Sequence, residues 1–167
     1  MDSKAILLVF YMFIFCCVGS NDSIYQDFEK SGSIINFNSI EIRLRHLDAV
    51  NAIRQERGLS DLTISPKLNA SADTHARDIF VQQRAWNFGS DSSSPLERAK
   101  IAGFDGLIRG ENVSETFEGE FLVLQAWLNE SLSRSVIMDS TATHLGFGWY
   151  QEKNGKIWWV QDIGEQR

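Results

Sequence analysis

Few of the titratable side chains in this 167-residue chain have the spacing of a familiar catalytic motif. The sequence contains no Gly-x-Ser-x-Gly turn for a serine nucleophile and no His-Glu-x-x-His pair for a catalytic zinc. Its two cysteines, Cys16 and Cys17, both lie in an apolar leader. Local spacing therefore indicates neither acyl transfer by an activated nucleophile nor zinc-dependent proteolysis.

The three histidines are the remaining candidates for metal binding or proton transfer. His75 follows Leu68 and Ala72 at helical spacing, so we expect it to be a hydrogen-bonded core histidine on the buried stripe of a helix. His144 opens a predicted strand and is a candidate ligand at the rim of a cavity. We expect His46, on an earlier helix, to be exposed.

Residues 1–20 have the pattern of a cleaved signal peptide. Lys4 precedes the apolar run Ala5–Phe15, which as a helix spans about 17 Å and is too short for a bilayer core of about 30 Å. Val18-Gly19-Ser20 then supplies the small residues of a cleavage site. An uncleaved anchor and lipidation at Cys16 or Cys17 are the alternatives. We expect a secreted or periplasmic protein, with a lipid-anchored surface protein as the less favoured alternative.

The rest of the chain has the composition of one acidic, ordered domain. Hydrophobic residues make up 43% of the chain, which is enough for a core, so disorder is excluded. With 22 acidic against 16 basic residues, the net charge of −6 argues against a nucleic-acid partner. Removal of the leader leaves no cysteine, so the domain must be stable without disulfides, as bacterial envelope proteins often are.

Capping patterns and periodicity predict helices followed by a hairpin. Residues 21–38 read as a linker or N-terminal arm, and residues 39–167 as the domain. Four helices are predicted: from Asn38 to Gly58, from Ser65-Pro66 onward, from Ser94-Pro95 to Gly103, and from about Glu118 to Leu132.

The C-terminal segments have the composition of strands. His144–Tyr150 and Lys156–Asp162 are rich in β-forming residues and flank an Asn154-Gly155 turn. A short strand or bend is predicted at Gly106–Gly110. The order of elements predicts an α+β domain with helices packed on an antiparallel sheet.

Several short motifs occur in one order across residues 43–164. They are Ile53–Leu59, Leu62, Leu68, Ala72–Asp78, Ser94–Ala99, Gly103-Phe104, Gly110-Glu111-Asn112, Trp127, Gly146-Phe147-Gly148 and Trp159-Val160-Gln161. This set resembles the CAP superfamily (cysteine-rich secretory proteins, antigen 5, pathogenesis-related 1), and within it the short bacterial branch without cysteines. The resemblance implies an α-β-α sandwich, with helices on both sides of an antiparallel sheet.

The resemblance also implies a cavity with two His and two Glu, in which the histidines hold zinc. Glu111 and Glu130 match the family glutamates in this chain, whereas Asn87 and Ser133 stand at the two histidine positions. Asn and Ser are poor zinc ligands, so we expect a degenerate, metal-free cavity. Zinc held by His144 or His75 is the alternative.

Two interpretations of Glu111 and Glu130 remain open. As neighbours in one cleft, two carboxylates would have separated pKa values and could act as general acid and base. Alternatively, Glu111 fixes a Gly-Glu-Asn turn by accepting backbone N–H bonds, and Glu130 is a solvated residue at a helix end. We favour the structural interpretation because no histidine is expected nearby.

The five tryptophans are expected mainly in the core. Trp127 lies on the buried face of its helix, and both Trp158 and Trp159 can be buried in a two-sided sandwich. Trp86, beside Asn87, is the best candidate for stacking against a ligand.

The expected function is that of a secreted binding or interaction module of the cell envelope or extracellular space, not an efficient enzyme. Its polar pocket would comprise Asn87, Glu111, Glu130 and Ser133, with Trp86 at the rim. The partner would be an envelope or extracellular ligand, and the domain a monomer without stable membrane insertion. The alternatives are a peptide or glycan hydrolase with Glu111 as general base, and a lipid- or sterol-binding protein.

Overall fold

A computed structural model describes residues 39–166 of the protein. The predicted signal peptide (1–20) and arm (21–38) lie outside these residues. The elements in chain order are α2 (Ser39–Gln55), β1 (Thr63–Ile64), α3 (Pro66–Gln82), α4 (Pro95–Ile101), β2 (Leu107–Glu115), α5 (Glu120–Asn129), α6 (Ser131–Ile137), β3 (His144–Gln151) and β4 (Ile157–Glu165).

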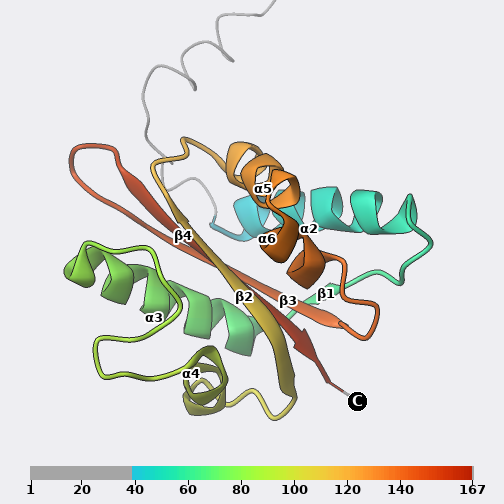
Figure 1. The fold of residues 1–167 in the computed structure, drawn as a ribbon, viewed down its shortest axis with the longest axis horizontal. Helices are drawn as coiled ribbons and strands as arrows, with labels where there is room; N and C mark the ends of the chain where they lie inside the picture. Colours follow the sequence, from blue (N-terminus) through green and yellow to red (C-terminus); the bar gives the residue numbers. More distant parts are fainter. Residues whose placement is uncertain (1–38, 167) are drawn as a thin grey trace, which may run out of the picture.

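A four-stranded sheet with the order β1-β3-β4-β2 forms the middle layer of the described domain. Strands β3 and β4 form the predicted antiparallel hairpin, β2 pairs antiparallel with β4, and β1 is parallel to β3. Helices α3 and α4 lie on one face of the sheet, and α2, α5 and α6 lie on the other (Figure 1). The predicted α-β-α sandwich is confirmed.

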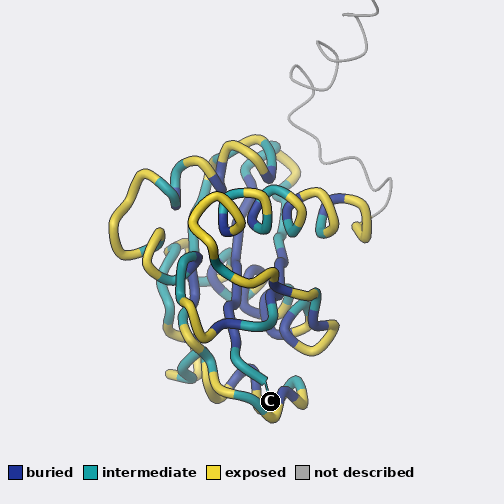
Figure 2. The backbone as a smooth tube through the Cα atoms, turned by 90° about the vertical axis from the view of Figure 1, so that its right-hand side faces the viewer, coloured by how far each residue is buried: buried dark blue, intermediate teal, exposed yellow. Residues whose placement is uncertain are grey.

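Each face of the sheet has its own apolar core, because side chains alternate along a strand. Trp159 packs with Trp127 and Phe147 beneath α2 and α5. Trp158 packs with Ala72, Ala76 and Ile79 of α3. Trp158 and Trp159 are both fully buried. The buried backbone in Figure 2 accordingly runs through the central layer, between outer segments that are largely exposed.

Close approach of α3 to β3 depends on two glycines in the Gly-Phe-Gly motif. A Cβ atom at Gly146 would overlap the backbone of Leu68, and one at Gly148 would overlap the backbone of Asp73. Only glycine lets the helix axis come this near the strand. This contact fixes the distance between α3 and the sheet. It therefore also fixes the positions of the α3 side chains that face the sheet, among them His75.

The helix starts follow the predicted caps. Ser65 caps α3 before Pro66, and Ser94 with Glu97 forms a complete capping box at the start of α4. The predicted helix from Glu118 to Leu132 is instead two helices, because Glu130 adopts an extended backbone and caps α6 with its side chain. The short strand or bend predicted at Gly106–Gly110 is a bend at Gly106 followed by the longer strand β2, so Gly110-Glu111-Asn112 lies within β2 and not in a turn.

Candidate functional site

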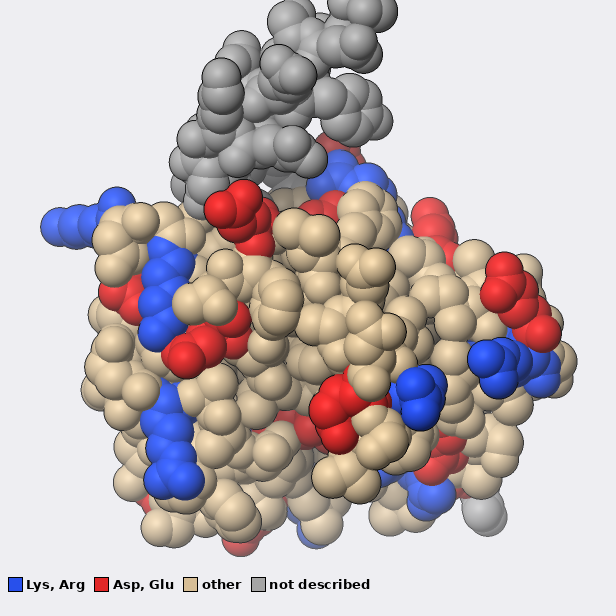
Figure 3. Space-filling model, turned by 45° about the horizontal axis from the view of Figure 1, so that its top comes forward, with Lys and Arg blue, Asp and Glu red and all other residues tan. Residues whose placement is uncertain are grey.

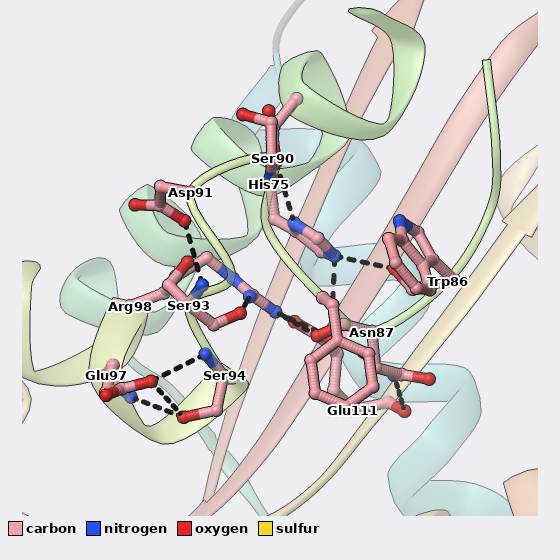
Figure 4. A network of polar contacts seen from close by, with 12 residues as sticks. His75, Trp86, Asn87, Ser90, Asp91, Ser93, Ser94, Glu97, Arg98 and Glu111 are labelled. Atoms are coloured by element: carbon pink, nitrogen blue, oxygen red, sulfur yellow. Dashed lines mark hydrogen bonds and ion pairs between the residues drawn. The ribbon is translucent and has the colours of Figure 1, made fainter. Parts of the chain in front are cut away.

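Glu111 is the centre of a buried polar cluster between β2, α3 and α4. Its side chain is 0% exposed, and the Arg98 Nη2 atom lies 2.8 and 2.7 Å from its two carboxylate oxygens. Asn87 adds a side-chain N–H bond of 3.1 Å to Oε1 (Figure 4). The partners of Glu111 are therefore side-chain donors, and not the backbone N–H groups expected of a turn. A carboxylate paired in this way is held as an anion.

Arg98 reaches Glu111 because the capping box begins α4 at a fixed point. The Arg98 guanidinium also donates from Nη1 to the Ser93 carbonyl at 2.7 Å and from Nη2 to the Asn87 carbonyl at 3.2 Å. One buried cation thus ties the α3–α4 loop to β2. Arg98 lies within the Ser94–Ala99 motif, directly after the capping-box residue Glu97, but it was not predicted as a site residue because its partner Glu111 is distant in sequence.

His75 lies beside Glu111, which corrects the expectation that no histidine is near this carboxylate. Its ring is fully buried, with Nε2 2.9 Å from the Trp86 carbonyl oxygen and 3.6 Å from Glu111 Oε1. Burial lowers the pKa of His75. Nδ1 is 3.9 Å from Asp78 Oδ2, beyond hydrogen-bond distance, whereas Nε2 has the closer oxygen acceptors. We therefore assign the proton of the neutral ring to Nε2, which leaves Nδ1 as an acceptor. His75 is thus the buried, hydrogen-bonded histidine expected from its helical spacing.

Asp162 is a second buried carboxyl group next to Glu111. The two residues are register partners in the β2–β4 ladder, and Asp162 is 0% exposed. Neither of its side-chain oxygens has a hydrogen-bond partner among the described residues. Burial and the negative charge of Glu111 raise the pKa of Asp162 well above its ordinary value, against a smaller lowering by the Ser71 hydroxyl. Glu111 therefore has a carboxyl neighbour, but this neighbour is Asp162 and not Glu130.

Glu130 and Ser133 do not join this cluster. Glu130 is exposed, and its carboxylate accepts the backbone N–H groups of Leu132 and Ser133, which lowers its pKa. The Ser133 carbonyl accepts a bond from Asn112, which points to the opposite face of the sheet from Glu111. The sheet therefore divides the residues that the resemblance placed in one pocket.

The histidines do not come together as a zinc site. His46, which we expected to be exposed, is fully buried against Phe147 with 3.8 Å between ring centroids, and burial lowers its pKa to about 3. His144 lies at the start of β3, where its Nδ1 atom is 2.7 Å from Thr143 Oγ1. His75 and His46 lie on opposite faces of the sheet. Residues 39–166 contain no group of three or more His, Cys, Asp or Glu residues that could hold a metal ion.

The residues at the family's histidine positions do not fit zinc either. The Asn87 amide nitrogen donates to the carbonyl and to the carboxylate of Glu111, so the atom that Asn87 directs at Glu111 is an N–H donor, which cannot ligate a metal ion. Ser133 contributes its main-chain carbonyl to Asn112. The side chains present therefore do not support zinc chemistry at this position.

Trp86 is half-buried and contacts three of its sequence neighbours. Its indole Nε1 donates to Gln82 at 2.7 Å, and the Arg84 guanidinium carbon lies 4.1 Å from the ring centroid. The ring also packs at 5.4 Å from the ring of Phe88. These contacts hold the ring next to the Glu111 cluster, and stacking of Trp86 against a ligand stays a prediction.

A cavity of about 520 Å³ lies between α3, the α3–α4 loop and α4. Ser71, His75 and Arg98 form part of its lining, together with Thr74, Asp78 and Ile101. The six residues proposed from the sequence for a pocket do not line it; they are Trp86, Asn87, Glu111, Glu130, Ser133 and His144. Glu111 does not line the cavity, but it contacts two residues that do, Arg98 and His75.

Fold and sequence together define a CAP domain, the three-layer domain of the cysteine-rich secretory proteins. Residues 47–163 match the profile of the Cysteine-rich secretory protein family, and the chain belongs to this family. The matched residues include helices on both faces of the sheet, the Glu111 cluster and the residues that line the cavity.

The relatives include bacterial proteins of the cell exterior. The chain is 29% identical over 119 residues to the uncharacterized protein YkwD of Bacillus subtilis, a match that covers 71% of this chain and 46% of YkwD. An extracellular protein containing a SCP domain from Bacillus anthracis has a TM-score of 0.67 at 21% identity, over 74% of this chain and 40% of that one. An outer surface protein from Borrelia burgdorferi has a TM-score of 0.70 at 15% identity, over 78% and 96% of the two chains.

The chain spans less than half the length of the two Bacillus subtilis relatives that it matches, 46% of YkwD and 34% of the uncharacterized membrane protein YlbC. These relatives therefore carry segments beyond the shared domain. Within residues 39–166, none of the helices has both the length and the apolar character needed to cross a membrane.

Proposed function

We propose that the chain is a secreted CAP-domain module that binds an envelope or extracellular ligand without a metal and without catalysing a reaction. The observation that carries this proposal is the state of Glu111. Its carboxylate is 0% exposed and both of its oxygens are paired with Arg98. The most family-typical acidic residue of the chain is thus used to hold the site together.

General-base chemistry by Glu111 is poorly supported by this geometry. A general base must come within hydrogen-bond reach of the proton that it removes, directly or through one water molecule. The Glu111 side chain has no exposed surface, and both of its carboxylate oxygens are already paired with Arg98. A substrate would have to displace Arg98 before it could use this carboxylate.

One observation favours hydrolysis as a second candidate function. His75 directs Nε2 toward Glu111 and lines the cavity, and its Nδ1 atom has no hydrogen-bond partner among the described residues. A carboxylate that orients a histidine is a common arrangement for a proton acceptor. However, Glu111 is already neutralised by Arg98 in this cluster, which weakens its influence on the ring.

A lipid or sterol is a poorer match to the cavity. Unpaired polar atoms of Ser71, His75 and Arg98 belong to its lining residues, and an alkyl chain would leave them without partners. A nucleic-acid partner is also disfavoured. Acidic and basic side chains are interspersed on the face shown in Figure 3, and the net charge of the chain is −6.

The proposed location follows from the leader and from the relatives. Residues 1–20 would be removed on export, residues 21–38 would form an arm, and residues 39–167 the binding domain. The names of two structural relatives describe an extracellular and an outer surface protein, which supports this proposal. Lipidation at Cys16 or Cys17 remains the alternative route to the cell surface, and the domain is proposed to act as a monomer.

Co-sedimentation with insoluble peptidoglycan tests binding, and release of soluble sugar or peptide fragments from the same material tests hydrolysis. We expect the wild-type protein to sediment with the polymer and to release no fragments above the buffer background. Fragment release that is lost in Glu111→Gln and His75→Gln, with both variants folded by circular dichroism, would establish the hydrolase instead. Insoluble peptidoglycan is the envelope material that this experiment takes as the ligand, so failure to sediment would overturn the proposal for the cell wall.

A further inference from the structure

The cavity beside α3 and α4 carries features of a ligand site distinct from the family's His/Glu positions. Figure 4 shows the elements that surround it, with His75 from α3, Arg98 from α4, and Ser90, Asp91 and Ser93 from the loop between them. Its volume of about 520 Å³ falls within the range of about 300–1,000 Å³ that is common for small-molecule sites.

Three lining residues have a buried polar atom without a hydrogen-bond partner in the described chain. These atoms are Ser71 Oγ, His75 Nδ1 and Arg98 Nε. The three residues are 2%, 0% and 7% exposed. Buried polar atoms of proteins are nearly always paired, so three such atoms around one cavity mark a place where polar groups from outside complete the bonding.

The three atoms require a ligand that both donates and accepts. Arg98 Nε is a donor only, and His75 Nδ1 is an acceptor because the ring proton is on Nε2. Ser71 Oγ can play either role, and the same hydroxyl lies near enough to Asp162 to lower the pKa of that carboxyl group. A hydroxyl group donates and accepts through one atom, so a molecule with several adjacent hydroxyls can satisfy donors and acceptors that alternate over a short distance.

The charges around the cavity disfavour an anion. Asp78 and Asp91 contribute carboxylates to the lining, and the positive charge of Arg98 is already paired with Glu111. A cation is disfavoured as well, because it has no acceptor atom for Arg98 Nε and would leave this buried donor unpaired. Asp78 Oδ2 already accepts from Gln82 Nε2 at 2.9 Å and from the Ser90 backbone N–H at 2.8 Å.

The accessible wall of the cavity is mostly carbon. Ile101 of α4 is 81% exposed, and Ala70 of α3 also lines the cavity. A pyranose ring has an apolar C–H face and a rim of hydroxyls, which matches a carbon wall combined with recessed polar atoms.

We propose that this cavity binds an uncharged sugar ring, with Arg98 Nε donating to a ring hydroxyl, His75 Nδ1 accepting from another, and Ile101 covering an apolar face. This inference rests on the proposed binding function and names its ligand class. Ser71 bonds a third polar group of the sugar. The site uses residues of α3 and α4 and leaves Glu111 as the support behind Arg98 and His75.

Amide chemical-shift titration of the ¹⁵N-labelled protein with glucose, galactose, mannose and N-acetylglucosamine tests the proposal. At least one of these sugars is expected to shift the amides of Ser71, His75 and the α3–α4 loop, with a dissociation constant on the order of 1 mM for a single ring. Inorganic phosphate and methylammonium, the charged probes, are expected to leave these amides unchanged.

Matched variants on α3 place the binding in the cavity. Thr74 is exposed and lines the cavity, so Thr74→Trp should weaken the sugar by at least about tenfold. Val81 is 72% exposed on the same helix and does not line the cavity, so Val81→Trp should bind like the wild type. Ser71→Ala should weaken binding several-fold.

The proposal is overturned if no sugar in the panel shifts these amides, if Thr74→Trp binds as well as Val81→Trp, or if phosphate or methylammonium binds more tightly than every sugar. These failures are distinguishable from failure of the proposed function. Peptidoglycan sedimentation without sugar shifts refutes this inference alone, whereas release of fragments refutes the non-catalytic function while the sugar site can stand.

Discussion

Glu111 and Asp162 are partners in the β2–β4 pairing, and their two buried carboxyl groups have opposite surroundings. Arg98 and Asn87 hold Glu111 as an anion, while Asp162 has no hydrogen-bond partner among the described residues and a raised pKa. Two adjacent buried carboxylates cannot both be ionised cheaply when one cation serves them. The charge state of this pair therefore depends on which of the two Arg98 reaches.

Asp162→Asn should make the protein more stable than the wild type as pH rises. In the folded protein the raised pKa keeps Asp162 protonated, whereas in the unfolded chain it ionises above about pH 4. The folded state then binds the extra proton, so wild-type stability falls with rising pH by up to about 1.4 kcal/mol per unit until the folded pKa is passed. Asn does not titrate and removes this loss.

Urea denaturation of wild type and Asp162→Asn at a series of pH values from acid to alkaline measures the effect. The difference between the two free energies of unfolding is the relevant quantity, because other groups such as His75 cancel in it. A difference that does not change with pH would show that Asp162 is ionised in the folded protein.

Arg98→Met should be strongly destabilising, and Glu111→Gln should offset part of the loss. Removal of Arg98 leaves the Glu111 carboxylate buried and uncompensated, a situation that costs about 3–5 kcal/mol. The double variant has no buried charge at this position, so it should be more stable than the sum of the two single losses implies. A double-mutant cycle by chemical denaturation measures the coupling, and additive effects would contradict the pairing.

Gly146→Ala should destabilise the domain because it pushes α3 away from β3. The added Cβ meets the backbone of Leu68, which cannot yield as a side chain can, so we expect a loss of about 1–3 kcal/mol or more. Gly119→Ala is the matched control, since a Cβ there has nothing within 4 Å. Thermal melting of both variants compares them, and equal melting temperatures would refute the close approach.

We expect zinc to bind weakly and without a defined ratio of metal to protein. The three histidines are dispersed over the described domain, and Asn87 and Ser133 supply no suitable ligand. Metal analysis of the purified protein and zinc titration of wild type and Glu111→Ala should give similar, micromolar or weaker binding for both. One tightly bound zinc per chain would require His75 or His144 to enter a site with different geometry.

Local sequence determined much of the fold. Ser65-Pro66 and Ser94–Glu97 begin helices where their caps predict, and Asn154-Gly155 joins the predicted hairpin. These features depend on residues a few positions apart, so their chemistry is readable in the chain itself. The family followed from the same kind of short motifs, taken in order.

The candidate site was decided by the tertiary structure. Arg98, His75 and Asp162 come from α4, α3 and β4 and meet at Glu111 only when α3 packs on the sheet and β4 pairs with β2 in one register. His46 was expected on the surface, yet it is buried because its ring stacks on Phe147 of β3 and forms a hydrogen bond with Gln161 of β4. Glu130 does not lie in the expected site because it adopts an extended backbone between α5 and α6 and uses its side chain to cap α6. Sequence spacing reports which side chains share a helix face, whereas burial and charge pairing depend on which distant elements come into contact.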